Sequence, residues 1–284
     1  MNKSGGANVI TSNIIMAFPY GNHSNRLFQN LHFEAFCIEH NIKYLNPTFC
    51  NISKYYVSPC RSYRGLKGRF TVFTMKIFKK TKLLHKIKNV KLFNIDNQDN
   101  RGELCNLSKI YNNIYTGGWY FRAHDLVEKH HDFFMQKYSL KYKYIPKAGL
   151  LDDINQWKLM NIIIVGIHIR RGDYISHEDG KYYDGVIYKK YMKLMQDEIY
   201  RVYERKCHFI IFSNEKTLIG ENQFISKSNN EWYIDHYLMS NCDYLIGPPS
   251  TFTSWASYMG KVKMFHIETA NDKLSLDKFK YCGG

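Results

Sequence analysis

The stretch NIIIVGIHIRRGDY, residues 161–174, decides the fold class of this chain. Its first nine residues form an apolar, β-branched run without helical spacing, which predicts a buried strand. Arg170 and Arg171 follow at the carboxyl end of that strand, where ligands bind in an open α/β sheet. Two adjacent guanidinium groups are costly to bury unless an anion neutralises them, and arginine grips phosphate through two parallel hydrogen bonds. The stretch therefore predicts a site for a phosphorylated ligand.

Strands and helices alternate along the rest of the chain. The patterns predict strands over 13–18, 161–169, 207–212, 244–246 and 262–267, helices over 25–40, 187–206 and 231–241, and a helix starting near Ser250. Such alternation is typical of an α/β fold whose parallel strands are joined by right-handed crossovers. A linker-like stretch at 142–146 precedes the second set of elements. We therefore predict an N-terminal domain over 1–150 and a C-terminal domain over 151–284.

The composition limits the class of protein. The chain has 284 residues, of which 44% are hydrophobic and 23% charged, so it can form full cores and global disorder is excluded. Its net charge of +15 favours an anionic partner. A nucleic acid, a membrane surface and a nucleotide sugar all meet this requirement.

The seven cysteines indicate a reducing compartment. They are scattered without a CxxC pair or metal-ligand spacing, and their odd number does not suggest a disulfide framework. The stretch 1–21 lacks a cleavable signal pattern, and no apolar run approaches the roughly 18 residues of a membrane span. We expect a cytoplasmic protein that is soluble or peripheral on the inner face of the membrane.

The segment 61–91 is strongly basic. It contains eleven Lys or Arg residues and no acid, with large apolar residues interleaved. One interpretation is a peripheral contact with an anionic membrane. The other is a solvated helical face that packs through its apolar residues, which is the usual role of a charge run.

Three loops follow three of the predicted strands and open on the same edge of the predicted sheet. They are His168-Ile-Arg-Arg-Gly-Asp-Tyr174, Phe212-Ser-Asn-Glu215 and Gly247-Pro-Pro-Ser-Thr-Phe-Thr-Ser-Trp255. In the third loop Ser250 or Thr251 is placed to cap a helix whose free N–H groups can receive a phosphate. We expect the three loops to converge on one ligand.

These loops resemble those of a known family. HIRRGDY, FSNE and DHYLMSNCDYLIGPPSTFTSWASYMG are similar to motifs of the α1,2-fucosyltransferases of glycosyltransferase family 11, and more distantly of the α1,6- and protein O-fucosyltransferases. The stretch SNRLFQN, residues 24–30, resembles the family's first motif. The resemblance implies the GT-B architecture, in which two Rossmann-like domains face each other across a cleft. It places GDP-fucose in the C-terminal domain and brings the acceptor in from the N-terminal one.

The resemblance also implies which residues hold the diphosphate of the donor. Arg170 grips the β-phosphate, and Arg171 supports this phosphate or the fucose. The cradle is completed by Ser250, Thr251 and the backbone N–H of Phe252. No Asp-x-Asp pair is present to hold a divalent cation, so we expect the two arginines and the helix N-terminus to stabilise the departing GDP without a metal or cofactor.

The nucleoside and the sugar have their own candidate residues by the same resemblance. His168 and a polar side chain of the FSNE loop, Glu215 or Asn214, read the guanine edge or the ribose. Asn25 lies near the sugar.

The catalytic base has two candidates. Glu178 lies ten residues after His168, the interval at which the α1,6 enzymes place a carboxylate proposed as base. Asp173 is the alternative, although its position directly after the arginines suggests a partner that orients one of them. The plain interpretation of Glu178 is a solvent-exposed loop acid.

The sequence thus predicts an inverting, metal-independent α1,2-fucosyltransferase. Its acceptor is a terminal hexose, often galactose in this family, in a surface glycan or its lipid-linked precursor. A related GT-B enzyme that transfers another sugar or forms another linkage is the first alternative. A basic nucleic-acid-binding protein is the second, but the chain lacks an RNA-recognition or helix-turn-helix signature, so no nucleic-acid partner is expected.

Overall fold

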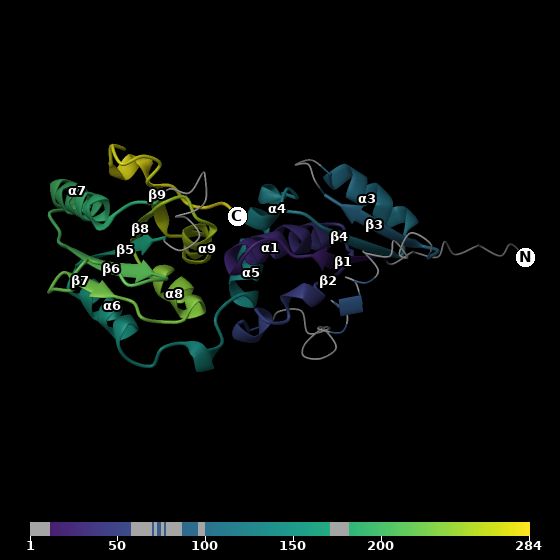
Figure 1. The fold of residues 1–284 in the computed structure, drawn as a ribbon, viewed down its shortest axis with the longest axis horizontal. Helices are drawn as coiled ribbons and strands as arrows, with labels where there is room; N and C mark the ends of the chain where they lie inside the picture. The colour runs from purple at the N-terminus through teal and green to yellow at the C-terminus, as the bar shows by residue number, and fades with distance from the viewer. Residues whose placement is uncertain are drawn as a thin grey trace, which may run out of the picture. The chain divides into compact units, whose positions relative to one another are not determined.

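The computed structural model describes residues 12–57, 70, 73–74, 77, 87–95, 100–170 and 182–284. The chain forms two compact units, Met1–Ser139 and Leu140–Gly284, and each contains its own parallel sheet (Figure 1). Most of the basic segment 61–91 lies outside the described residues. No helix of the described part is long and apolar enough to cross a bilayer.

The N-terminal domain is built on a four-stranded sheet of order β2-β1-β4-β3. Its strands are β1 (Asn13–Phe18), β2 (Lys43–Leu45), β3 (Val90–Asn94) and β4 (Asn113–Gly117), and its helices are α1 (His23–Glu39), α3 (Arg101–Ile110), α4 (His124–Lys129) and α5 (His131–Lys137). All neighbouring strands are parallel. The central helix α1 buries Leu27, Leu31 and Phe36 completely, which anchors it to the domain core.

The C-terminal domain contains a five-stranded sheet of order β7-β6-β5-β8-β9, again with every pair parallel. Its strands are β5 (Ile163–Ile169), β6 (Cys207–Ser213), β7 (Ile225–Lys227), β8 (Tyr244–Gly247) and β9 (Lys263–His266), and its helices are α6 (Leu150–Leu159), α7 (Gly185–Tyr203), α8 (Trp232–Met239) and α9 (Thr251–Gly260). The predicted α/β fold with parallel strands is therefore confirmed in both units.

Strand β5 is buried on both faces. All seven of its residues are buried, and successive side chains point to opposite sides of the sheet. Val165 and Ile167 pack into the core that α7 covers, whereas Ile164 packs with residues of α8 and α9. This double burial explains why the strand is a continuous apolar run rather than an alternating one.

The strand order creates a switch point between β5 and β8. The chain passes from β5 to β6 and β7 on one side, then returns to place β8 and β9 on the other. The close fit of the two central strands requires a glycine at the end of β8, because a Cβ at Gly247 would lie 2.7 Å from the backbone oxygen of His168. In parallel sheets, ligands bind beyond the carboxyl ends at such a point.

Two elements of this domain were not expected from the sequence. Helix α6 follows the linker-like stretch, and β7 pairs with β6 through three residues, Phe209, Ile210 and Ile211, of the longer strand. Both elements are short and are defined by their packing against β5 and β6. The pattern of β7, with three residues, is too short to separate from loop sequence.

Candidate functional site

The carboxyl ends of β5, β6 and β8 carry the predicted site residues. Register pairs Ile169 of β5 with Ser213 of β6, so Arg170 and Asn214 follow neighbouring strand ends. Arg170 is half-buried, whereas Asn214 and Glu215 are exposed. Arg171, Asp173 and Glu178 lie outside the described residues.

The third loop ends at the N-terminus of α9. The Ser250 hydroxyl caps this helix and accepts a hydrogen bond from the N–H of Phe252 at 3.2 Å. Thr251 is the first residue of the helix, which lies directly beyond the end of β8. The first turn of a helix presents N–H groups and a partial positive charge, both suited to a phosphate. Donation by the Phe252 N–H to a ligand would replace its bond to Ser250.

His168 lies beneath this helix start rather than in the open. Its Nδ1 is 2.8 Å from the hydroxyl oxygen of Thr253, and its ring stacks on Phe252 with centroids 5.1 Å apart. The ring of His236, from α8, contacts Phe252 at a centroid distance of 4.0 Å. The start of α9 is therefore fixed in place by two imidazoles that sequence inspection did not connect with it.

Burial sets the charge of His168. Desolvation, with smaller effects from Arg170 and His266, lowers the pKa of His168 to about 3. The imidazole is therefore neutral at physiological pH and adds no positive charge at the carboxyl end of β5. Its neutral ring can share a proton with the Thr253 hydroxyl.

The buried neutral imidazole leads to a prediction about stability. The folded-state pKa of His168 lies below the ordinary value of 6.5, so the unfolded chain takes up a proton that the folded chain does not as pH falls below 6.5 towards 3. Between about pH 7.5 and 5.5 the free energy of unfolding should fall about 1.4 kcal/mol more in the wild type than in His168→Gln. Urea denaturation at both pH values measures this. An identical pH dependence of the two proteins would contradict it.

A cavity of about 490 Å³ opens beside the end of β6. Its lining residues come from the ends of β6 and β7 and the loops after them: Ile211, Ser213, Asn214, Glu215, Lys216, Thr217, Glu221, Lys227, Ser228, Asn229 and Asn230. Its volume is in the range of small-molecule sites. Asn214 and Glu215 therefore belong to a single concave site with polar groups from two strand ends.

Asp235 is a buried carboxyl group behind the wall of this cavity. It lies in the first turn of α8 and accepts a hydrogen bond from the Ser228 hydroxyl at 2.5 Å. Ser228 also accepts a bond from the Asn230 amide at 2.9 Å. Burial raises the pKa of Asp235 to about 7 despite the Ser228 bond. The predicted helix over 231–241 contains Asp235, but its pattern did not indicate that this carboxyl group would be buried beside a cavity.

The N-terminal domain has a separate aromatic stack at the ends of β1 and β4. The rings of Tyr20 and Trp119 stack with centroids 5.0 Å apart, and the Arg122 guanidinium lies 4.1 Å from the Trp119 ring centroid. Trp119 is thus held between two neighbours, whereas Tyr20 is 48% exposed. These residues follow the two central strands, whose junction is the switch point of this sheet.

Gln29 of α1 ties the loops of this stack together. Its amide accepts a hydrogen bond from the Tyr20 N–H at 3.1 Å and donates to the Phe18 and Gly118 oxygens at 3.2 and 3.1 Å. Asn25 lies one turn earlier on α1, over the turn at Gly21, where any Cβ would collide with the Asn25 amide. Asn25 is therefore at the end of β1, in the N-terminal domain.

Comparison with known proteins decides the family of the chain. The model of glycosyl transferase family 11 matches residues 70–281, which include the β5, β6 and β8 loops. The chain belongs to glycosyl transferase family 11. The chain is also similar to the O-antigen biosynthesis glycosyltransferase WbnK of Escherichia coli, with 24% identity over 180 residues. This match covers 58% of the chain. The match spans 54% of the length of that relative.

One solved structure shows that this family 11 chain has a GT-B-like fold. A mutant of Arabidopsis thaliana FUT1 in complex with GDP matches with a TM-score of 0.55 and 10% identity, covering 98% of this chain and 75% of that one. POFUT1 in complex with GDP-fucose matches with a TM-score of 0.46 and 11% identity, covering 90% of this chain and 96% of that one. At 10% identity the match to FUT1 establishes the fold and no residue roles.

Proposed function

We propose that this family 11 chain transfers L-fucose from GDP-fucose to the 2-hydroxyl of a terminal hexose, with inversion at the anomeric carbon. The acceptor is a galactoside in a surface glycan or its lipid-linked precursor on the cytoplasmic side of the membrane. Family membership supports the reaction class. The name of the Escherichia coli relative, an O-antigen biosynthesis glycosyltransferase, supports a surface glycan.

The observation that carries this proposal is that Arg170 and the capped N-terminus of α9 follow the ends of two neighbouring strands, β5 and β8. A guanidinium and a helix N-terminus are both groups that bind phosphate oxygens. These two groups provide positive charge for the diphosphate on both sides of the switch point.

The nucleoside of the donor fits the cavity at the end of β6. Asn214 and Glu215 line it, and the Asp235 carboxyl lies behind Ser228 in its wall. A guanine base presents N–H donors at its edge, which carboxylate and amide oxygens accept. His168 acts in this arrangement through Thr253 and Phe252, because it holds the start of α9 against β5.

The proposed reaction is a single displacement at the anomeric carbon. The acceptor oxygen forms a bond to C1 of fucose while the bond from C1 to the β-phosphate oxygen breaks, and GDP leaves with the electron pair. The hydroxyl proton passes to Glu178. Arg170, Arg171 and the α9 N-terminus stabilise the negative charge that develops on GDP, and each well-placed donor is worth about 3 kcal/mol in the transition state.

We propose that Tyr20 forms a stacking surface for the acceptor sugar. Its ring is half-exposed, supported from below by Trp119, and its backbone N–H is fixed by Gln29. Replacing Tyr20 by alanine should raise the KM for the acceptor about tenfold, because an aromatic contact worth about 1.4 kcal/mol is lost. The KM for GDP-fucose should not change.

Steady-state kinetics with both substrates varied tests this role of Tyr20. Tyr20→Phe is the matched control, since it keeps the ring and should keep the acceptor KM. A rise in KM for GDP-fucose rather than for the acceptor would place Tyr20 on the donor side instead.

Metal independence is a further prediction. Because arginines and a helix N-terminus supply the charge that a divalent cation supplies in other transferases, EDTA should leave the initial rate of transfer unchanged. Initial rates are compared before and after chelation, and again after adding Mn²⁺. A rate that disappears with EDTA and returns with Mn²⁺ would contradict the prediction.

Thermal unfolding in the presence of nucleotides tests the proposed donor. At about 100 times its Kd, GDP should stabilise the protein by about 2.7 kcal/mol, and UDP and CDP should stabilise it less. If GDP has no effect but the protein binds DNA or RNA with a steep salt dependence, the nucleic-acid alternative replaces this proposal.

A further inference from the structure

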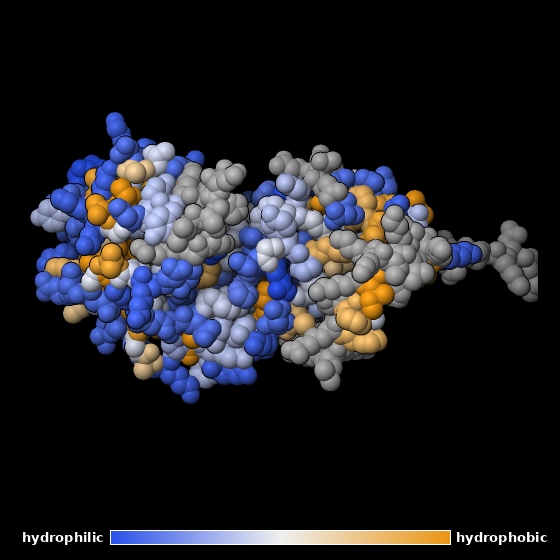
Figure 2. Space-filling view, viewed as in Figure 1, coloured by the Kyte–Doolittle hydropathy of each residue, from blue (hydrophilic) through white to orange (hydrophobic). Residues whose placement is uncertain are grey.

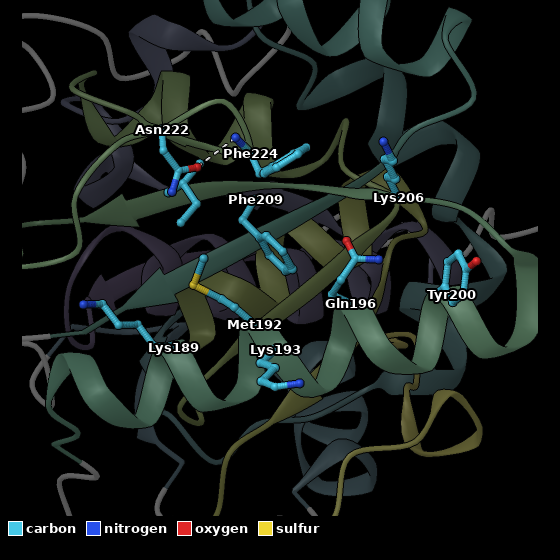
Figure 3. Close-up of a pocket in the computed structure, with 10 residues that line it drawn as sticks. Lys189, Met192, Lys193, Gln196, Tyr200, Lys206, Phe209, Asn222 and Phe224 are labelled. Atoms are coloured by element: carbon cyan, nitrogen blue, oxygen red, sulfur yellow. Dashed lines mark hydrogen bonds between the residues drawn. The ribbon is translucent and has the colours of Figure 1, made fainter.

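A groove of about 660 Å³ runs between α7 and the β6–β7 edge of the C-terminal sheet (Figure 3). Lys189, Lys193, Gln196 and Tyr200 are spaced along one face of α7, and Phe209 of β6 and Phe224, just before β7, face them. Residues at intervals of three and four share a helix face, which explains the continuous wall. The proposed donor site uses the opposite, carboxyl ends of these strands.

The floor of this groove is apolar and open to solvent. Met192 and Phe209 form its base, and the rings of Phe224 and Tyr200 remain 45% and 63% exposed. In Figure 2 the visible face of the C-terminal domain is mostly hydrophilic, with hydrophobic residues grouped over α7 and β7. Exposed aromatic rings around a concave apolar floor are a feature of surfaces that bind apolar ligands.

The rim of the groove is positively charged. Three of its lining residues are lysines and none is acidic. Lys193 is neutralised by Asp197 at 2.9 Å. Within the described part of the chain, Lys189 and Lys206 make no such ion pair, and both are exposed at opposite ends of the groove (Figure 3). The groove thus has an apolar floor with an exposed lysine at each end. It is complementary to an amphipathic molecule in which an apolar chain is attached to an anionic group.

The amide oxygens of two residues that line the groove already accept hydrogen bonds within the protein. The Gln196 amide accepts from the Cys207 N–H at 2.8 Å, and Asn222 accepts from the Phe224 N–H at 2.8 Å. A peptide brings backbone N–H and C=O groups that need partners, whereas an acyl chain needs none. The groove therefore suits a hydrocarbon better than a peptide.

Addition of a peptide strand at the β7 edge is also blocked. The Lys227 N–H donates to the Glu221 carboxylate at 3.1 Å, and Ile225 exchanges both backbone hydrogen bonds with Asn222 at 3.0 Å. A peptide that adds to a sheet binds through the free backbone N–H and C=O groups of the edge strand. Here these groups of β7 are already hydrogen-bonded within the protein, so a peptide has few partners at this edge.

We propose that this groove binds an anionic phospholipid of a membrane surface. One acyl chain lies over Met192 and Phe224, and Lys189 and Lys206 contact the phosphates of this lipid and of its neighbour in the membrane. The site is independent of the proposed fucosyl transfer, and it would hold the C-terminal domain at an anionic membrane surface.

Vesicle co-sedimentation tests the proposal. We expect the full chain to bind phosphatidylcholine vesicles that contain about 30% phosphatidylglycerol far better than vesicles of phosphatidylcholine alone. Lys189→Glu/Lys206→Glu should weaken this binding at least about 30-fold, since each lysine near an anionic surface contributes about fivefold. Phe224→Ser should weaken it about tenfold through lost apolar burial.

The matched control is Lys147→Glu/Lys273→Glu, which changes the net charge equally at two exposed lysines outside the groove. We expect this variant to bind like the wild type, and circular dichroism should show that all variants unfold at the same temperature. Equal losses in the control would overturn the proposal in favour of general attraction by the charge of +15. So would full binding by the groove variant, which would assign the contact to another segment such as 61–91, or no binding to anionic vesicles at all.

Discussion

Replacing Arg170 by lysine should lower kcat for fucosyl transfer on the order of 100-fold, the largest loss we expect from a described residue. Arg170 follows the last residue of β5 and is half-buried, and in the proposed reaction its guanidinium contacts the diphosphate. Lysine keeps the positive charge but replaces a planar fork of donors with one ammonium group. The loss should be greater in kcat than in the KM for GDP-fucose, because charge on GDP increases as the bond to fucose breaks.

Steady-state kinetics with GDP-fucose measures the effect at Arg170. Arg201→Lys on α7 is the matched control, since Arg201 is exposed and pairs with Glu198 at 2.9 Å away from the strand ends. The control should retain wild-type kinetics. If Arg170→Lys has the same kcat as the wild type, the Arg170 guanidinium does not stabilise the transition state.

Replacing Glu178 by glutamine should lower kcat about a thousandfold while the Kd for GDP stays the same. Glutamine has nearly the same shape but cannot accept the proton of the acceptor hydroxyl. The acidic limb of the pH profile of kcat/KM should disappear in this variant, because that limb reports protonation of the base. Calorimetric titration with GDP gives the affinity separately from the rate.

Asp173→Asn distinguishes the two candidate carboxylates. If Asp173 orients an arginine, its amide variant should weaken GDP binding and lower kcat together, whereas Glu178→Gln affects kcat alone. The reverse pattern, with GDP binding lost in Glu178→Gln and only kcat lost in Asp173→Asn, would exchange the two roles.

Much of the C-terminal fold was predictable from the sequence because β5 is buried on both faces. That burial requires a run of apolar residues, which is a strong local signal, and the adjacent arginines mark the carboxyl end of the strand. The parallel arrangement followed from the alternation of strands and helices. The three loops could then be assigned to one sheet edge before any contact was known.

The contacts that complete the site could not be predicted in the same way. Asp235 is buried because β7 and the loop after it bring Ser228 against α8, and β7 has only three residues. The role of Gln29 depends on two loops separated by about a hundred residues, at Tyr20 and Gly118. Such arrangements arise from tertiary packing, and no periodic pattern of the sequence indicates them.

The most direct test of the account is the identity of the product. The purified protein is incubated with GDP-fucose and a panel of terminal galactosides, and products are analysed by mass spectrometry and by NMR of the linkage. We predict release of GDP with one α1,2-linked fucose per acceptor and no product from UDP- or CDP-sugars. Transfer of a different sugar, a different linkage, or no transfer despite GDP binding would contradict the proposed function.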